Sequence, residues 1–286
     1  MTTPKIAMLG LGSMNGAILS GFLGAGTAPE DVIATSRSAA SARVRSEQHG
    51  VTVLAEEDDA AANRTAAAQA DIVFLGVKPH QITGLCGEIR DALKPGAVVV
   101  SVAAAVTVEM MESALNPGQP VVRTMPNTPL SVGLGVVGLV PGTHCSRDQT
   151  EQIAGLLGSS GEVHILPEEQ IDALTGVAGS GPAYAFYLAE HMAAAGVEMG
   201  LDPELAADLA AQTLYGAGRM LVESRPARSA APADAAQLRR NVTSPNGTTQ
   251  RAVETFDARG MAEAIRAGAK ASSARAAEIT RQLEES

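Results

Sequence analysis

Aromatic residues are scarce in this chain of 286 residues, which has no tryptophan, three tyrosines and four phenylalanines. Apolar residues still make up 45% of the chain, a normal share for a globular protein with a buried core. That core must be built from alanine, valine, leucine, isoleucine and methionine. The length accommodates one large domain or two of ordinary size.

Cysteine is also nearly absent, since Cys86 and Cys145 are the only two. Two cysteines give neither a disulfide framework nor the spacing of a zinc site, so we expect no bound metal. We interpret them as thiols of a protein that works in the reducing cytoplasm.

The sequence lacks a membrane segment and an excess of basic residues. No uncharged apolar run reaches the roughly 18 residues of a membrane span, and no basic stretch precedes an apolar one at the N-terminus. The net charge of −10 argues against nucleic acid, because phosphate contacts require a basic face. We expect a soluble, cytoplasmic protein without membrane or nucleic-acid partners.

The first half of the chain alternates β-branched runs with stretches of helical composition. This alternation predicts a parallel sheet covered on both faces, that is, an α/β Rossmann-like dinucleotide-binding domain over residues 1–166. The expected strands are Lys5–Leu9, Val32–Thr35, Val51–Leu54, Ile72–Gly76, Ala97–Val102, Val121–Met125, Val136–Val140 and Val163–Ile165. The helices between them include Ser13–Leu23, Ala39–His49, Gln81–Leu93 and Ser146–Leu157.

After Pro167 the strand pattern ends, and residues 167–286 are expected to form an all-α domain. Pro182 and Pro203 suit the first turn of a helix, where a missing N–H costs nothing. The stretch Arg225–Ala236 is rich in Pro, Ala and Ser and is expected to be an exposed loop. The expected helices are Glu168–Thr175, Pro182–Met199, Pro203–Glu223, Thr248–Ala258 and Met261–Glu284.

A glycine-rich turn follows the first expected strand and opens the first helix. Gly10 permits the tight turn, and Gly12 lets the backbone approach a pyrophosphate. Ser13 and Met14 begin the helix, whose free N–H groups favour an anion. The third glycine of the usual fingerprint falls at Asn15. The turn predicts a dinucleotide site, and the alternative is a tight structural turn.

The end of the second strand selects between the two nicotinamide cofactors. Ser36 and Arg37 stand where NAD-binding proteins usually carry a carboxylate for the ribose 2′-hydroxyl. A hydroxyl and a guanidinium suit a 2′-phosphate, so NADPH is favoured over NADH. The alternative is a solvated arginine at the start of a helix.

Two further loops follow strands at the same edge, where open α/β sheets bind ligands. The first contains Val77, Lys78 and Pro79, and the second contains Ala103 and Ala104. The small residues of the second loop would let a flat ring lie against the backbone. We include all five residues in the expected cofactor site, although Lys78 could be an ordinary surface residue.

Several longer strings resemble the pyrroline-5-carboxylate reductase family and occur in the family's order. They are RTMPNTP (123–129), TGVAGSGPAY (175–184) and NVTSPNGTT (241–249), together with the Lys78-Pro79 loop. The resemblance extends from the glycine-rich turn to about residue 271. It implies an NADPH-dependent oxidoreductase that reduces the C=N bond of 1-pyrroline-5-carboxylate to L-proline, the last step of proline biosynthesis.

The resemblance also implies roles for particular residues. Asn63 matches an asparagine that contacts the adenosine ribose, and Asn241 matches one near the cofactor. Glu168 is placed at the substrate site, with Thr175 near it as a candidate catalytic hydroxyl. Glu168, Asp172 and Thr175 are spaced to share one face of a helix. The alternative for the acids is a solvated helix start.

The string around residue 246 reads as a turn that leads into a helix. The family usually has glycine at Asn246, and asparagine tolerates the same left-handed backbone. N–H groups at the helix start favour a carboxylate. By resemblance the substrate carboxylate binds here, at Ser244, Gly247, Thr248 and Thr249, and the Thr249 hydroxyl bonds the ring nitrogen as the main catalytic group.

Three rival functions remain open from the sequence. An imine reductase could use the same plan on another substrate. The β-hydroxyacid dehydrogenases also share it but depend on a lysine in the long interdomain helix, and this chain has no lysine between Lys94 and Lys270. A non-catalytic NADP-binding protein would have no use for the turn at 244–249.

The helix expected over Pro182–Met199 carries apolar residues on more than one face, so it must be buried on several sides. The alanine-rich helices around it offer little bulk for that purpose. We therefore expect a homodimer or a larger homo-oligomer, which the family resemblance also implies. A compact monomer is the alternative.

Overall fold

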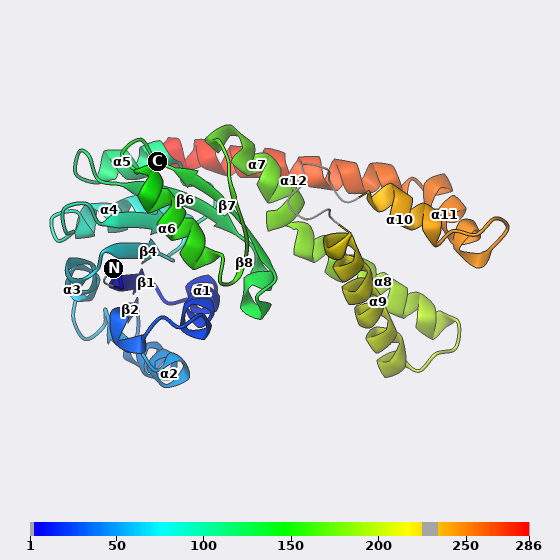
Figure 1. Ribbon diagram of the computed structural model, residues 1–286, viewed down its shortest axis with the longest axis horizontal. Coiled ribbons are helices and arrows are strands. Elements are labelled where there is room, and N and C mark those ends of the chain that lie inside the picture. The colour runs from blue at the N-terminus through cyan, green and yellow to red at the C-terminus, as the bar shows by residue number, and fades with distance from the viewer. Residues whose placement is uncertain (1–2, 225–233, 286) are drawn as a thin grey trace. The chain divides into compact units, whose positions relative to one another are not determined.

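The computed structural model describes residues 3–224 and 234–285 (Figure 1). Its eight strands form one sheet in the order β3-β2-β1-β4-β5-β6-β7-β8. All eight expected strands are present, with ends that differ by about two residues at most. They are β1 (Ile6–Leu9), β2 (Val32–Ser36), β3 (Thr52–Ala55), β4 (Ile72–Leu75), β5 (Val98–Ser101), β6 (Val121–Pro126), β7 (Gly135–Pro141) and β8 (Gly161–Ile165).

The sheet is mixed, which corrects the expectation of a purely parallel one. Strand β7 runs antiparallel to β6, while every other neighbouring pair is parallel. Between β6 and β7 lies only the short 3-10 helix η3 (Thr128–Val132). A parallel return needs a crossover of about a dozen residues or more, so this link forces the chain to reverse.

Helices cover both faces of the sheet and produce two apolar clusters. Ile18 and Phe22 of α1 and Leu157 of α6 pack with alternate strand residues on one face. Ile82 and Ile89 of α4 pack on the other. The helices of this part are α1 (Ser13–Gly24), α2 (Ala39–His49), α3 (Ala62–Gln69), α4 (Ile82–Ile89), α5 (Val108–Ala114) and α6 (Arg147–Leu157), with the 3-10 helices η1 (Pro29–Asp31) and η2 (Pro79–Gln81).

The buried thiol of Cys86 belongs to the second cluster. Burial raises the pKa of this thiol to about 12, so it stays protonated at neutral pH. Both cysteines are free, as expected for two isolated thiols.

The segment after β8 is not the single helix expected over Glu168–Thr175. It consists of the 3-10 helix η4 (Glu168–Gln170), one turn of α-helix α7 (Ile171–Leu174) and the π-helix η5 (Thr175–Gly179). Glycines at 176, 179 and 181 weaken the regular α-helix here. The expected shared helix face of Glu168, Asp172 and Thr175 therefore does not apply.

The chain divides into two compact units, residues 1–179 with 271–286, and residues 180–270. This division differs from the boundary expected after residue 166, because residues 167–179 and the end of the last helix pack with the sheet. Ile171 and Leu283 both join the second apolar cluster.

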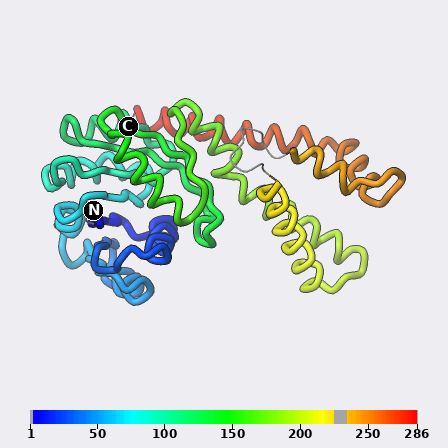
Figure 2. The backbone as a smooth tube through the Cα atoms, viewed as in Figure 1, coloured from blue at the N-terminus to red at the C-terminus, as the bar shows by residue number. Residues whose placement is uncertain are grey.

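The second unit is all helical, as expected. Helices α8 and α9 lie side by side in it (Figure 2). The helices are α8 (Gly181–Glu198), α9 (Pro203–Glu223), α10 (Ala235–Asn241), α11 (Thr248–Ala258) and α12 (Met261–Glu284), the last of which continues into the first unit.

The loop expected over Arg225–Ala236 lies largely outside the described residues, which omit 225–233. Its last residues begin α10 instead, with Asp234 as the N-cap. No helix within residues 3–224 and 234–285 combines the length and the apolar character that a membrane crossing requires.

Candidate active site

The glycine-rich turn follows β1. Strands β2 and β3 lie on one side of β1 and β4 lies on the other, so the strand order reverses at this point. Gly10 has a φ of +76°, and a Cβ there would lie 2.8 Å from Val77 Cγ1, so only glycine fits. The N–H of Leu11 donates to the Thr35 carbonyl at 2.7 Å, and the N–H of Gly12 donates to the Gly10 carbonyl at 2.8 Å. The turn is thus held at the switch point, where open α/β sheets bind ligands.

A chain of two hydrogen bonds fixes this turn from the side. The N–H of Gly10 donates to Thr35 Oγ1 at 3.0 Å, and the Thr35 hydroxyl donates to Asn63 Oδ1 at 2.8 Å. Thr35 and Asn63 are both buried. Asn63, expected at the adenosine ribose, is therefore held at this edge, and its Nδ2 group makes no hydrogen bond to the described residues.

Asn15, in place of the third glycine, is accommodated by a glycine on the neighbouring strand end. Its Nδ2 donates to the carbonyls of Leu9 and Gly10, both at 3.3 Å. A Cβ at Gly76 would lie 2.2 Å from that same nitrogen. The close approach that the fingerprint normally obtains from its third glycine is obtained here from Gly76.

The start of α1 fits a pyrophosphate. Its N-cap is Gly12, with no side-chain cap, and a Cβ built there would meet nothing within 4 Å. Ser13 and Met14 follow as the first helical residues, so unpaired N–H groups and the positive end of the helix dipole face open space. His49 lies near Gly16 of this helix. Burial lowers the pKa of its imidazole, and the charge of Arg45 lowers it further, so His49 is neutral at pH 7.

At the end of β2, Ser36 is buried and Arg37 is exposed. Arg37 forms no ion pair with the residues that the structure describes. Ser38 caps α2 by accepting from the Ser41 N–H at 3.3 Å. A 2′-phosphate would find a free guanidinium here, in agreement with the expected preference for NADPH.

A carboxylate that sequence reasoning missed lies beside Arg37. Glu57 Oε2 accepts a hydrogen bond from the Ala39 N–H at 2.9 Å, and the Glu57 N–H donates to the Arg37 carbonyl at 3.0 Å. The residue comes from the loop after β3, not from the end of β2. The parallel pairing of Ser36 with Ala55 is the feature that brings it there.

The two other expected cofactor loops end the adjacent strands β4 and β5. Val77 packs against Gly10, Lys78 is exposed, and Pro79 opens η2. After β5 the Ala103 N–H donates to Ser101 Oγ at 3.2 Å, and Ala104 is exposed. The ends of β2, β1, β4 and β5 thus bring every expected cofactor residue of the first unit to one edge.

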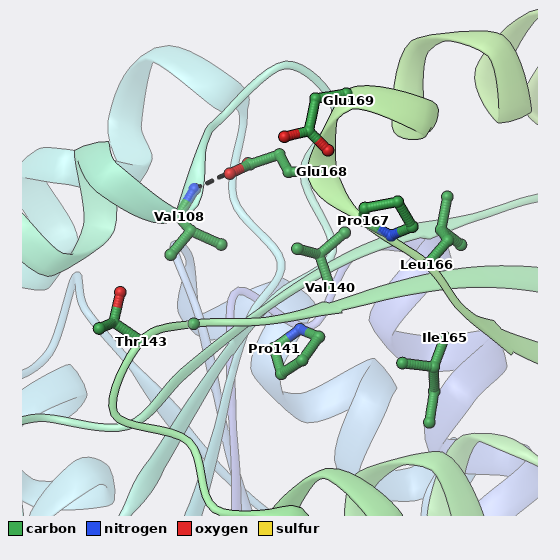
Figure 3. A pocket seen from close by; sticks show the side chains of 10 residues that line it. Val108, Val140, Pro141, Thr143, Ile165, Leu166, Pro167, Glu168 and Glu169 are labelled. Atoms are coloured by element: carbon green, nitrogen blue, oxygen red, sulfur yellow. Dashed lines mark hydrogen bonds between the residues drawn. The ribbon is translucent and has the colours of Figure 1, made fainter.

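Glu168 occupies a different position, at a cavity of about 570 Å³ (Figure 3). Its Oε1 accepts from the Val108 N–H at 3.0 Å and from Arg123 Nη1 at 2.7 Å. The Arg123 side chain is only 5% exposed, and a buried guanidinium requires such a partner. The cavity is lined by residues 108, 140–143 and 165–169. Glu168 therefore forms an ion pair with Arg123, and its role in substrate binding stays a prediction.

Arg123 and Asn127 belong to the string RTMPNTP, and the sequence alone predicted no role for either. Asn127 Nδ2 donates to the Ala178 carbonyl at 3.0 Å, and its Oδ1 accepts from the Val136 N–H at 2.8 Å. Arg123, through Glu168, and Asn127, through Ala178, attach both ends of the segment 168–178 to β6 and the loop that follows it. A charged residue within an apolar strand was the signal for Arg123. Thr175, in the same segment, donates its hydroxyl to the Ile171 carbonyl at 2.8 Å.

The remaining expected residues lie in the second unit, around the start of α11. Asn246 has a φ of +59°, so asparagine does adopt the left-handed conformation expected of it. The Gly247 N–H donates to the Ser244 carbonyl at 3.0 Å and closes the turn. Gly247 caps α11 without a side-chain bond, and Thr248 and Thr249 follow, both exposed. Asn241 ends α10 and accepts from Gln237 Nε2 at 2.7 Å.

Two family models match this chain. One, described as pyrroline-5-carboxylate reductase dimerisation, matches residues 168–279. The other, described as NADP oxidoreductase coenzyme F420-dependent, matches residues 5–105. The first lies over the helical part, and the second covers the strand ends that gather the expected cofactor residues.

Relatives extend the match over nearly the whole chain. A pyrroline-5-carboxylate reductase from Pseudomonas aeruginosa is 37% identical, over 99% of both chains, and one from Mycobacterium leprae is 36% identical, over 96% of both. The solved structure of a pyrroline-5-carboxylate reductase from Coxiella burnetii superposes with a TM-score of 0.87 at 34% identity, covering 98% of this chain and 99% of that one.

These matches confirm the resemblance seen in the motif strings and place the switch-point turn and the helical segment within one known architecture. The chain belongs to the pyrroline-5-carboxylate reductase family.

Proposed function

We propose that this chain is an NADPH-dependent oxidoreductase that reduces the C=N bond of 1-pyrroline-5-carboxylate to L-proline. The main support for the proposal is that this member of the family has two helix starts that can each bind an anion. One is the uncapped helix start at Gly12, and the other is the uncapped helix start at Gly247. We also propose that it works in the cytoplasm, where free thiols such as Cys86 persist.

In this proposal the switch-point edge holds the cofactor. Gly10, Gly12, Ser13 and Met14 receive the pyrophosphate, and Ser36 and Arg37 receive the 2′-phosphate. Asn63 contacts the ribose, and the other expected residues of this edge are Val77, Lys78, Pro79, Ala103 and Ala104. Asn241, in the second unit, is assigned to the cofactor by the family resemblance alone. When bound, NADPH supplies the hydride, so the protein needs to bind and orient rather than to generate a strong nucleophile.

The start of α11 is the proposed carboxylate site. The N–H groups of Thr248, Thr249 and Gln250 belong to the first helical turn and have no helical acceptor. Ser244 and Gly247 close the turn that aims them outward. A substrate carboxylate would satisfy these donors and the helix dipole together.

The reaction requires little acid–base catalysis from the protein. A protonated imine is already electrophilic, so orientation and exclusion of water supply most of the acceleration. A hydroxyl bond to the ring nitrogen holds the proton there, and we assign it to Thr249. Thr175, also expected near the substrate, already donates its hydroxyl to the Ile171 carbonyl, which leaves only its oxygen lone pairs.

Consumption of NADPH on addition of 1-pyrroline-5-carboxylate, with proline identified as the product, tests the function. Oxidation of NADPH without proline would point to another imine, and binding without oxidation would point to a non-catalytic protein. Either result would contradict the proposal.

Replacement of Arg37 tests the cofactor preference. Arg37→Ala should raise the KM for NADPH roughly tenfold, because one charge-assisted bond to phosphate contributes about 1.5 kcal/mol. The NADH kinetics should hardly change. Arg43→Ala is the control, because it removes an arginine from the following helix α2, where Arg43 pairs with Glu47. Equal effects of Arg37→Ala on both cofactors would show that Arg37 does not contact the 2′-phosphate.

Replacement of Thr249 tests the catalytic hydroxyl. Thr249→Val keeps the side-chain shape, and kcat/KM for the imine should fall roughly tenfold, equivalent to about 1.4 kcal/mol. NADPH binding should be unchanged. Thr255→Val is the control, since that hydroxyl donates to the Arg251 carbonyl within the same helix. Full turnover by the Thr249 variant would leave orientation alone as the source of catalysis.

The helical unit is also proposed to join a second copy of the chain. Among its described residues only Gly196, Ala206 and Ala210 are buried. Phe186, Tyr187 and Met199 are 68%, 65% and 79% exposed, which a stable monomer rarely permits. An apolar cavity of about 690 Å³ lies among α8, α9, α11 and α12. The helices of a partner would cover these surfaces by a two-fold arrangement.

Light scattering after size exclusion at low micromolar concentration measures the assembly. We expect a mass of at least twice the 29.1 kDa chain. Because the exposed apolar area is what drives association, Phe186→Glu should dissociate the assembly and abolish activity. The exposed Glu204→Gln is the control. A stable and active species at the mass of one chain would contradict dimerisation.

A further inference from the structure

We infer that Glu57 is a specificity-determining residue that weakens the preference for NADPH and allows NADH to be used. The inference rests on the proposed function, because it concerns the same cofactor site. It adds a residue outside the sequence motif by which nicotinamide cofactors are usually told apart.

The backbone places Glu57 beside Arg37. Strands β2 and β3 pair in parallel up to Ser36 and Ala55, and the ladder continues beyond them. The Glu56 N–H donates to the Ser36 carbonyl at 2.9 Å, and the Glu57 N–H donates to the Arg37 carbonyl at 3.0 Å. The position of Glu57 is therefore fixed by main-chain bonds on the two residues assigned to the 2′-phosphate.

The carboxylate of Glu57 already uses a donor that a phosphate would need. It accepts the Ala39 N–H at 2.9 Å, and Ala39 is the first residue of α2. An N–H at this position has no acceptor within the helix and favours an anion. Glu57 thus occupies an anion position at the start of α2, and its main chain is bonded to that of Arg37.

The two cofactors respond differently to a carboxylate at this point. A 2′-phosphate carries nearly two negative charges, so Glu57 must repel it or move away from Ala39 before it binds. A 2′-hydroxyl can instead donate to the carboxylate, as it does to the acid of NAD sites. Arg37 therefore favours NADPH, while Glu57 opposes it and supports NADH.

Isothermal titration calorimetry with adenosine 2′,5′-bisphosphate and 5′-AMP tests this, since the two probes differ only in the 2′-phosphate. Glu57→Gln keeps an acceptor for the Ala39 N–H, so the fold should be preserved. We expect the bisphosphate to bind about fivefold more tightly, as expected when a nearby like charge is removed from a solvated site. Binding of 5′-AMP should be unchanged or weaker.

Asp58→Asn is the matched control, because it removes the same charge one residue away. Asp58 is exposed, and its side chain makes no hydrogen bond to the described part of the chain. In Asp58→Asn the ratio of the affinities for the bisphosphate and for 5′-AMP should equal the ratio in the wild type. An unchanged ratio in Glu57→Gln, or an equal change in Asp58→Asn, would overturn the inference.

The same experiment separates this inference from the proposed function. If the ratio shifts in Glu57→Gln while the wild type fails to reduce 1-pyrroline-5-carboxylate, the inference stands and the reaction is wrong. If the wild type reduces the imine and the ratio does not shift, the reaction stands and the role of Glu57 is wrong. If neither probe binds, both are wrong.

Discussion

The hydrogen-bonded chain from the Gly10 N–H through Thr35 to Asn63 is the constraint on which the candidate site depends. It joins the ends of β1 and β2 to the start of α3, and thus connects three elements that are far apart in the sequence. Thr35 and Asn63 are buried, so losing the bond between them would leave a polar group unsatisfied away from water. The positions proposed for the pyrophosphate, the ribose and the 2′-phosphate all follow from this one network.

The two units meet the need for burial in different ways. Helices cover both faces of the first unit's sheet, and the residues of its central strands β1, β4 and β5 are buried. Among the described residues of the second unit only small ones are buried, and Phe186, Tyr187 and Met192 of α8 are exposed. An isolated chain with so little internal packing would gain little stability from this unit. Association with a second copy explains why the helices can be both long and rich in alanine.

Much of the fold could be predicted from the sequence, because β-branched runs mark the strands and the glycine turn marks the start of α1. Strand direction is not encoded in such runs, so the reversal at β7 was missed and follows instead from the short link through Thr128–Val132. Pairs that form through space were also missed. Arg123 with Glu168, Asn15 with Gly76, and Glu57 with Ala39 are each brought together by the sheet rather than by their spacing.

The most direct test of this account is the affinity for NADPH, measured by fluorescence titration, of Thr35→Val and of Thr124→Val. Both threonines are buried in the sheet, and the Thr124 hydroxyl donates to the Ser101 carbonyl at 2.7 Å, away from the glycine turn. Each substitution should lower the free energy of unfolding by about 1–3 kcal/mol. The account predicts that only Thr35→Val weakens NADPH binding, by roughly tenfold, because only Thr35 positions Gly10 and Asn63. Equal NADPH affinities in the two variants would contradict it.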